Sequence, residues 1–110
     1  MINHQHYTYR IIWSDEDQEF VGLCAEYPSL SYLAIDDYQA LQGIKKLVQD
    51  VMKDMEEQGE EIPVPISQRN YSGKFQVRIL PELHRRLAIE ATEANVSLNR
   101  YISNKLASSS

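Results

Sequence analysis

The sequence predicts an α+β fold divided into two small domains, residues 1–68 and 69–110. Residues 7–62 have the pattern of three short strands and one long amphipathic helix, whereas residues 74–106 have the pattern of one strand and two shorter helices. The net charge also changes sign. Residues 1–70 carry five basic and thirteen acidic side chains, a charge of −8, and the remainder carries six basic and three acidic ones, a charge of +3. The length and these changes of pattern and charge favour two small domains over one.

The first domain opens with a predicted antiparallel meander. Residues 7–13 are rich in aromatic and β-branched side chains, which is typical of a strand, and Tyr7, Tyr9, Ile11 and Trp13 on one face alternate with Thr8, Arg10 and Ile12 on the other. A charged turn leads to a second strand at residues 19–25, and a proline separates this strand from a third at residues 30–35. Residues 1–6 are expected to be a frayed terminus.

A long helix is predicted to follow the meander and to lie on its sheet. Asp36 and Gln39 have the spacing of a helix cap, and Gly59 marks the end. The apolar stripe of this helix is Leu41, Ile44, Val48, Val51, Met52 and Met55. Residues 60–72 contain two prolines and are predicted to be a final short strand or a linker.

The second domain begins with a predicted strand whose polarity alternates strictly. Its apolar face consists of Phe75, Val77 and Ile79. Pro81 suits the first turn of a helix, and Ser97 suits the cap position of the next one. One amphipathic strand and two short helices cannot close a core alone, so we expect two copies to pair their strands antiparallel about a two-fold axis.

Such a paired ribbon predicts a DNA-binding surface. Its polar face would present Lys74, Gln76 and Arg78 from each copy. A two-stranded ribbon fits the major groove, where arginine or lysine reads guanine and glutamine reads adenine, so these residues are predicted to contact bases. Amides at a helix N-terminus complement phosphate. The residues predicted to contact phosphate are therefore Ser97, Leu98, Asn99 and Arg100.

No catalytic residue, metal site or cofactor is predicted. The histidines and the single Cys24 lack zinc-ligand spacing, and the alternating Asp15, Asp17 and Glu19 lack the glycine and glutamate of a calcium loop. We expect no enzyme, because the strands offer no converging carboxylates, and a metal-dependent nuclease is the enzymatic alternative. A single cysteine excludes an intramolecular disulfide, and the sequence has neither a signal-peptide pattern nor a long apolar run, so a cytoplasmic protein is expected.

The run YSGKFQVRILPELHRRLAIEATEANVSLNRYISNKL resembles the C-terminal domain of the HicB antitoxin family, which is a ribbon-helix-helix DNA-binding domain. The alternating strand, the PELHRRLA opening of the first helix and the SLNRYISNKL helix stand in register with it. Residues 7–62, including the run AEYPSLSYLAID, are similar to the N-terminal domain of that family, a partial ribonuclease-H-like fold that lacks the catalytic residues.

This resemblance implies a type II antitoxin. Residues 1–68 would bind and block a small basic HicA-type toxin that cleaves messenger RNA, and residues 69–110 would form a homodimer, bind operator DNA and repress the operon. Assembly beyond the dimer is left open. The alternative is a solitary ribbon-helix-helix transcriptional regulator whose N-terminal domain binds a ligand or mediates assembly. A small basic protein that co-purifies in stoichiometric amount favours the antitoxin, whereas clean self-association favours the regulator.

Overall fold

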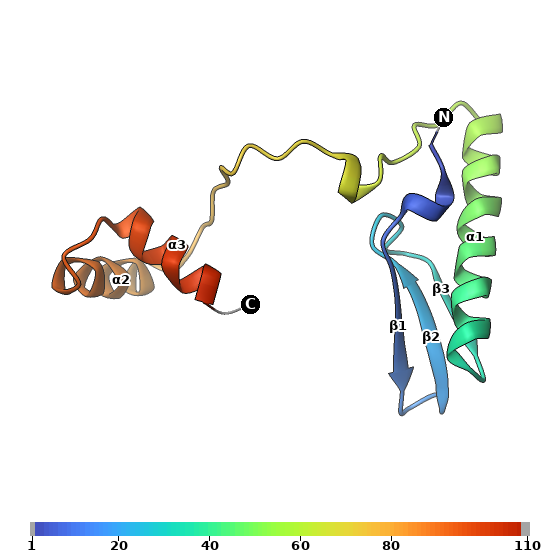
Figure 1. Cartoon of the computed structure of the whole chain (residues 1–110), viewed down its shortest axis with the longest axis horizontal. Helices are drawn as coiled ribbons and strands as arrows, with labels where there is room; N and C mark the ends of the chain where they lie inside the picture. Colours follow the sequence, from blue (N-terminus) through green and yellow to red (C-terminus); the bar gives the residue numbers. More distant parts are fainter. Residues whose placement is uncertain (1, 109–110) are drawn as a thin grey trace. The chain divides into compact units, whose positions relative to one another are not determined.

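The computed structural model describes residues 2–108 and divides into two compact units, with the break between Tyr71 and Ser72. We call them unit 1 and unit 2. Unit 1 contains a small sheet with one long helix along it, and unit 2 contains two shorter helices (Figure 1).

The sheet of unit 1 has three antiparallel strands in the order β1-β2-β3. They are β1 (Tyr9–Ser14), β2 (Glu19–Cys24) and β3 (Ser31–Ala34). The predicted meander is confirmed, although β1 begins two residues later than predicted. The register pairs Tyr9 with Cys24 and Ser14 with Glu19. The ribonuclease-H-like assignment stays a prediction.

Residues 2–8, which precede β1, are ordered, so the prediction of a frayed terminus is wrong for them; Met1 lies outside the described residues. They form a short 3-10 helix, η1 (His4–His6), whose cap residue Asn3 accepts a hydrogen bond from the Gln5 amide at 2.9 Å. The Tyr9 hydroxyl donates to the His4 carbonyl oxygen at 2.7 Å, and η1 also contacts the long helix. These contacts hold the terminus because Tyr7 and Tyr9 turn their rings toward the core.

Helix α1 (Asp37–Glu57) covers one face of the sheet and contacts all three strands (Figure 1). The predicted cap is confirmed, because the Asp36 carboxylate accepts a hydrogen bond from the Gln39 amide at 2.7 Å. Its buried residues repeat every four positions, as Ala40, Ile44, Val48 and Met52. The helix approaches β2 so closely that a Cβ at Gly22 would lie 2.9 Å from Ile44 Cβ.

Residues 58–71 run back along unit 1 and contain a second 3-10 helix, η2 (Ile66–Gln68). No strand forms in this stretch of the described chain, so of the two predicted alternatives the strand is wrong. Pro65 is almost fully buried. The segment is therefore packed as part of unit 1.

Unit 2 contains α2 (Pro81–Glu93) and α3 (Leu98–Ser108), and both predicted helices are confirmed. Pro81 occupies the first turn of α2, and Asn95 adopts a positive φ of 63° where the chain turns between the helices. The strand predicted at residues 74–79 does not form. The reason is physical: ladder hydrogen bonds need a second strand, and the described part of unit 2 contains none. The ribbon-helix-helix assignment stays a prediction.

Candidate functional site

The residues predicted to contact bases lie on an exposed stretch of unit 2. Lys74, Gln76 and Arg78 occupy alternate positions and are all exposed. The apolar residues between them are exposed as well: Phe75 is 74% exposed, Val77 67% and Ile79 37%. Large apolar side chains left in water to this extent are typical of a surface that a partner covers.

These apolar residues share a groove with the two helices of unit 2. The groove has a volume of about 480 Å³, and its apolar lining is Phe75, Val77, Ile79, Leu87, Ile102 and Leu106. The alternation in the sequence is thus reproduced in space, because every second residue from Phe75 to Ile79 turns to the groove.

The residues predicted to contact phosphate form the first turn of α3. The Ser97 hydroxyl oxygen accepts a hydrogen bond from the Arg100 amide at 3.1 Å, which confirms its prediction as a cap. The amides of Leu98 and Asn99 lie in the first turn, where a helix supplies no acceptor of its own. Leu98 is half-buried, so any contact that it makes with phosphate must come from its backbone.

The structure brings together only part of the predicted set. Lys74 and Asn99 both border the apolar groove. Gln76 and Arg78 line a separate shallow hollow of about 590 Å³. One chain therefore does not assemble the base-contacting and phosphate-contacting residues into a single site, and the assignment depends on the pairing of two copies.

A buried carboxylate in unit 1 was not predicted as important from the sequence. Glu26 is only 8% exposed, and its two oxygens accept hydrogen bonds from the Thr8 amide at 2.9 Å, the Thr8 hydroxyl at 3.1 Å and the Ile66 amide at 2.9 Å. The Cys24 thiol donates to the same carboxylate at 3.6 Å. We call this arrangement the Glu26 clip, because it ties residue 66 to the start of the chain.

The hydrogen bonds of the Glu26 clip favour the ionised form of the carboxyl group. Burial opposes ionisation, but the hydrogen bonds from the amides of Ile66 and Thr8 outweigh it and lower the pKa of the Glu26 carboxyl below its usual value. Beside the clip, the Tyr7 hydroxyl donates to the Pro63 carbonyl oxygen at 2.7 Å. The segment after α1 is thus held at two neighbouring points.

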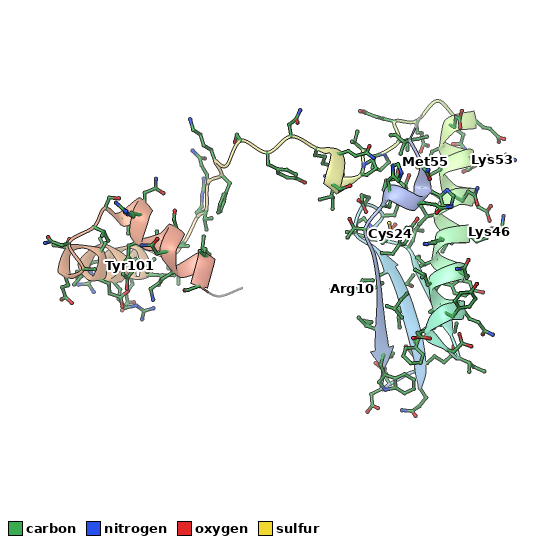
Figure 2. The ribbon with its side chains drawn as sticks, in the orientation of Figure 1. Arg10, Cys24, Lys46, Lys53, Met55 and Tyr101 are labelled. Carbon is green, nitrogen blue, oxygen red and sulfur yellow. The ribbon has the colours of Figure 1, made fainter. Side chains whose placement is uncertain are left out.

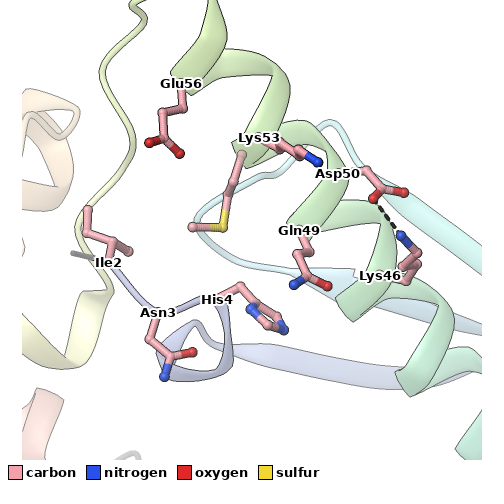
Figure 3. Close-up of a pocket in the computed structure, with 9 residues that line it drawn as sticks. Ile2, Asn3, His4, Lys46, Gln49, Asp50, Lys53 and Glu56 are labelled. Atoms are coloured by element: carbon pink, nitrogen blue, oxygen red, sulfur yellow. Dashed lines mark hydrogen bonds and ion pairs between the residues drawn. The ribbon is translucent and has the colours of Figure 1, made fainter.

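Unit 1 also has a hollow of about 610 Å³ between η1 and the outer side of α1 (Figure 3). Its charged lining residues include Lys46 and Asp50, whose side chains form an ion pair at 2.8 Å. Carboxylates and lysines alternate around it, so it favours no single sign of ligand. Within residues 2–108, no three His, Cys, Asp or Glu side chains come together as a metal site would require.

None of the helices within residues 2–108 combines the length and the apolar character needed to cross a lipid bilayer.

Comparison with known proteins adds a family match. The model of the HicB family matches residues 56–106, which include the end of α1, η2, all of α2 and α3 as far as Leu106. A search of curated proteins and a search of solved structures each found no match. The match over residues 56–106 supports the assignment of this chain to the HicB family.

Proposed function

We propose that this chain is the antitoxin of a type II toxin–antitoxin pair. In this proposal unit 2 forms a two-fold dimer that binds operator DNA and represses the operon, and unit 1 neutralises a small basic HicA-type toxin that cleaves messenger RNA. The family match over residues 56–106 supports a toxin–antitoxin-related role.

The observation that carries the DNA-binding part is the open apolar groove of unit 2. Two copies that pair residues 74–79 antiparallel would supply each other's missing ladder bonds, and the two apolar rows would lie together on one face of the ribbon, against the four helices of the dimer. The opposite row, Lys74, Gln76 and Arg78, would then project together from the two-stranded ribbon. Such a ribbon has the width and the donor groups that the major groove accepts.

The charge of each unit supports the division of labour. Residues 72–110 carry a net charge of +3, which favours binding to phosphate, whereas the rest of the chain carries −8 and would be repelled by DNA. An RNA-cleaving toxin needs a positive surface for its substrate, so an acidic domain can both attract that surface and occupy it. The proposal gives neither unit a catalytic role.

Two arginine variants test the DNA-binding assignment in the full-length protein. Arg78→Ala is expected to cost about 1–3 kcal/mol on DNA taken from upstream of the chain's own reading frame, and to relax sequence preference, because a bidentate base contact is lost. Arg100→Ala is expected to weaken binding to all sequences alike and to reduce the salt slope by about one unit for each phosphate contact removed.

The measurement is the affinity for upstream and scrambled DNA over a series of salt concentrations. Unchanged discrimination by Arg78→Ala, or a loss of discrimination by Arg100→Ala as large as that of Arg78→Ala, would show that the ribbon does not carry the specificity. If the unmodified protein does not distinguish upstream from scrambled DNA, the repressor part of the proposal is wrong.

A further inference from the structure

The sheet of unit 1 has one face that α1 does not cover. The register places Ile12 beside Val21, and Val21 beside Leu33, so these three side chains form a row across all three strands. Their neighbours in sequence, such as Gly22 and Cys24, face α1, and the alternation of a strand therefore turns the row to the opposite side. We call this side, with Ile12, Val21, Leu23 and Leu33, the open face.

The middle of the open face is apolar where a solvent-facing sheet is ordinarily polar, and Arg10 and Ser31 lie on either side of Leu23. Ile12 is 42% exposed and Leu33 is 46% exposed, whereas Val21, which lies between them, and Leu23, two residues further along β2, are half-buried. Beyond Leu23 the surface sinks into a hollow of about 370 Å³ that Arg10 and Pro28 also line. Figure 2 labels Arg10 on β1, and Lys46 and Lys53 on α1. A contiguous apolar row of this kind marks an interaction surface more often than a scattered exposed residue does.

One end of the open face is strongly acidic. Glu19 lies on this face opposite Ser14, and the turn that follows β1 adds Asp15, Glu16 and Asp17. Two of these carboxylates are held in place by the turn: Asp15 accepts from the Trp13 indole nitrogen at 3.3 Å, and Asp17 accepts from the Ser14 hydroxyl at 2.9 Å. We call these four carboxylates the acidic rim. It lies beside the apolar row.

We infer that the open face is the docking surface for a small basic RNA-cleaving protein, and this inference rests on the proposed function. The apolar row supplies burial, and the acidic rim supplies attraction to a positive surface that otherwise binds RNA. A second copy of this chain fits the face less well, because two units of charge −8 repel each other. Nucleic acid is also disfavoured as the occupant of the open face, because its phosphates carry the same sign of charge as unit 1.

The test uses the full-length protein and a purified HicA-type toxin from the same genome, with affinity measured by calorimetry and neutralisation measured by RNA cleavage. Leu33→Lys adds a positive charge to the exposed row and is expected to weaken toxin binding about tenfold or more. Gln42→Lys is the matched control, because it adds the same charge to an exposed position on α1 and is expected to change the affinity by less than about twofold. Ile12→Thr is a milder second variant of the row that keeps a β-branched side chain for the strand.

A third variant separates attraction from burial. Glu16→Gln removes one charge of the rim, and it is expected to slow association and to weaken its dependence on salt while dissociation stays unchanged. An association rate equal to that of the unmodified protein would overturn the role of the rim.

The remaining outcomes are distinct from one another. If the toxin binds the unmodified protein and Leu33→Lys and Ile12→Thr equally well, the inference is wrong and the proposed function stands. If the unmodified protein neither binds nor blocks the toxin, the toxin-binding part of the proposed function fails, and the inference fails with it. If Leu33→Lys instead reduces self-association and leaves toxin binding unchanged, a second copy occupies the face and the inference is overturned.

Discussion

Glu26 shows how one side chain can tie together parts of a chain that are distant in sequence. Its carboxylate oxygens accept hydrogen bonds from the amide of Thr8, which lies 18 residues before it, and from the amide of Ile66, which lies 40 residues after it. No spacing rule connects positions so far apart, and the sequence shows Glu26 only as one acid among many. A buried carboxylate that accepts several backbone hydrogen bonds becomes recognisable only once the chain has folded.

The Glu26 clip predicts a stability effect. Glu26→Gln is expected to lower the free energy of unfolding by about 1–3 kcal/mol, because the amide has one acceptor oxygen and its NH₂ group would face an amide donor. Glu61→Gln, at an exposed position, is the matched control and is expected to have little effect. Urea denaturation of the full-length protein, followed by the fluorescence of Trp13, measures both. Equal midpoints for the two variants would contradict the clip.

The same carboxylate makes stability depend on pH. Its pKa is lower in the folded protein than in the unfolded chain, so the stabilisation is fully present above the unfolded value and is lost as the pH falls through the folded value. Between about pH 5 and pH 3 the urea midpoint of the unmodified protein is therefore expected to fall more than that of Glu26→Gln. Parallel falls would mean that other carboxyl groups govern the acid sensitivity.

At the scale of elements, helices were easier to predict than the surfaces of strands. The capping pair Asp36 and Gln39 and the apolar repeat fixed the start and the buried side of α1, since both signals are local. Tyr9, Ile11 and Trp13, which were predicted to share one face of β1, lie on the face that turns to α1. The open face was missed because Ile12 was placed on the polar side of its strand, although Val21 and Leu23 in β2 are apolar at the matching positions. Both faces of β2 carry apolar residues, and this pattern was the available signal that the second face of the sheet is apolar as well.

The start of α3 allows capping to be separated from phosphate binding. Ser97→Asp keeps an acceptor for the Arg100 amide, so the stability of the helix is expected to be unchanged, whereas a carboxylate there would repel a phosphate and weaken DNA binding. Ser97→Ala is the complementary variant, because it removes the cap and is expected to cost about 1 kcal/mol of stability. Circular dichroism melts and DNA affinity measure the two effects. If Ser97→Asp binds DNA as tightly as the unmodified protein, the start of α3 does not face a phosphate.

At the scale of the whole molecule, the proposed DNA-binding surface needs two copies of the chain. The strand predicted at residues 74–79 is absent from the single chain, where the described part of unit 2 offers no second strand to form a ladder. The sequence predicts the alternation, which is local, and the structure places the apolar half of it in a groove. Neither supplies the second copy, so the dimer remains a prediction.

Adjacent positions in this segment provide a test of the pairing. Val77→Asp would bury a charge in the proposed dimer and is expected to weaken self-association by more than about tenfold. Gln76→Asp introduces the same side chain on the opposite face and is expected to leave the dimer intact. Sedimentation of the full-length protein at micromolar concentrations measures both. A monomeric unmodified protein, or equal behaviour of the two variants, would contradict the paired ribbon.

The exposed stretch from residue 72 to residue 80 lies outside every helix and strand of the single chain, and it joins the acidic unit to the basic one. Proteases cut where backbone is accessible and free of regular structure. Pairing of two copies would hide this stretch in a ladder, so the unpaired chain would be the form that is cut. The lifetime of the protein would then rise with its own concentration. One cut would end the proposed repression, because it would separate the proposed DNA-binding unit from the rest, and it would leave the open face of unit 1 whole.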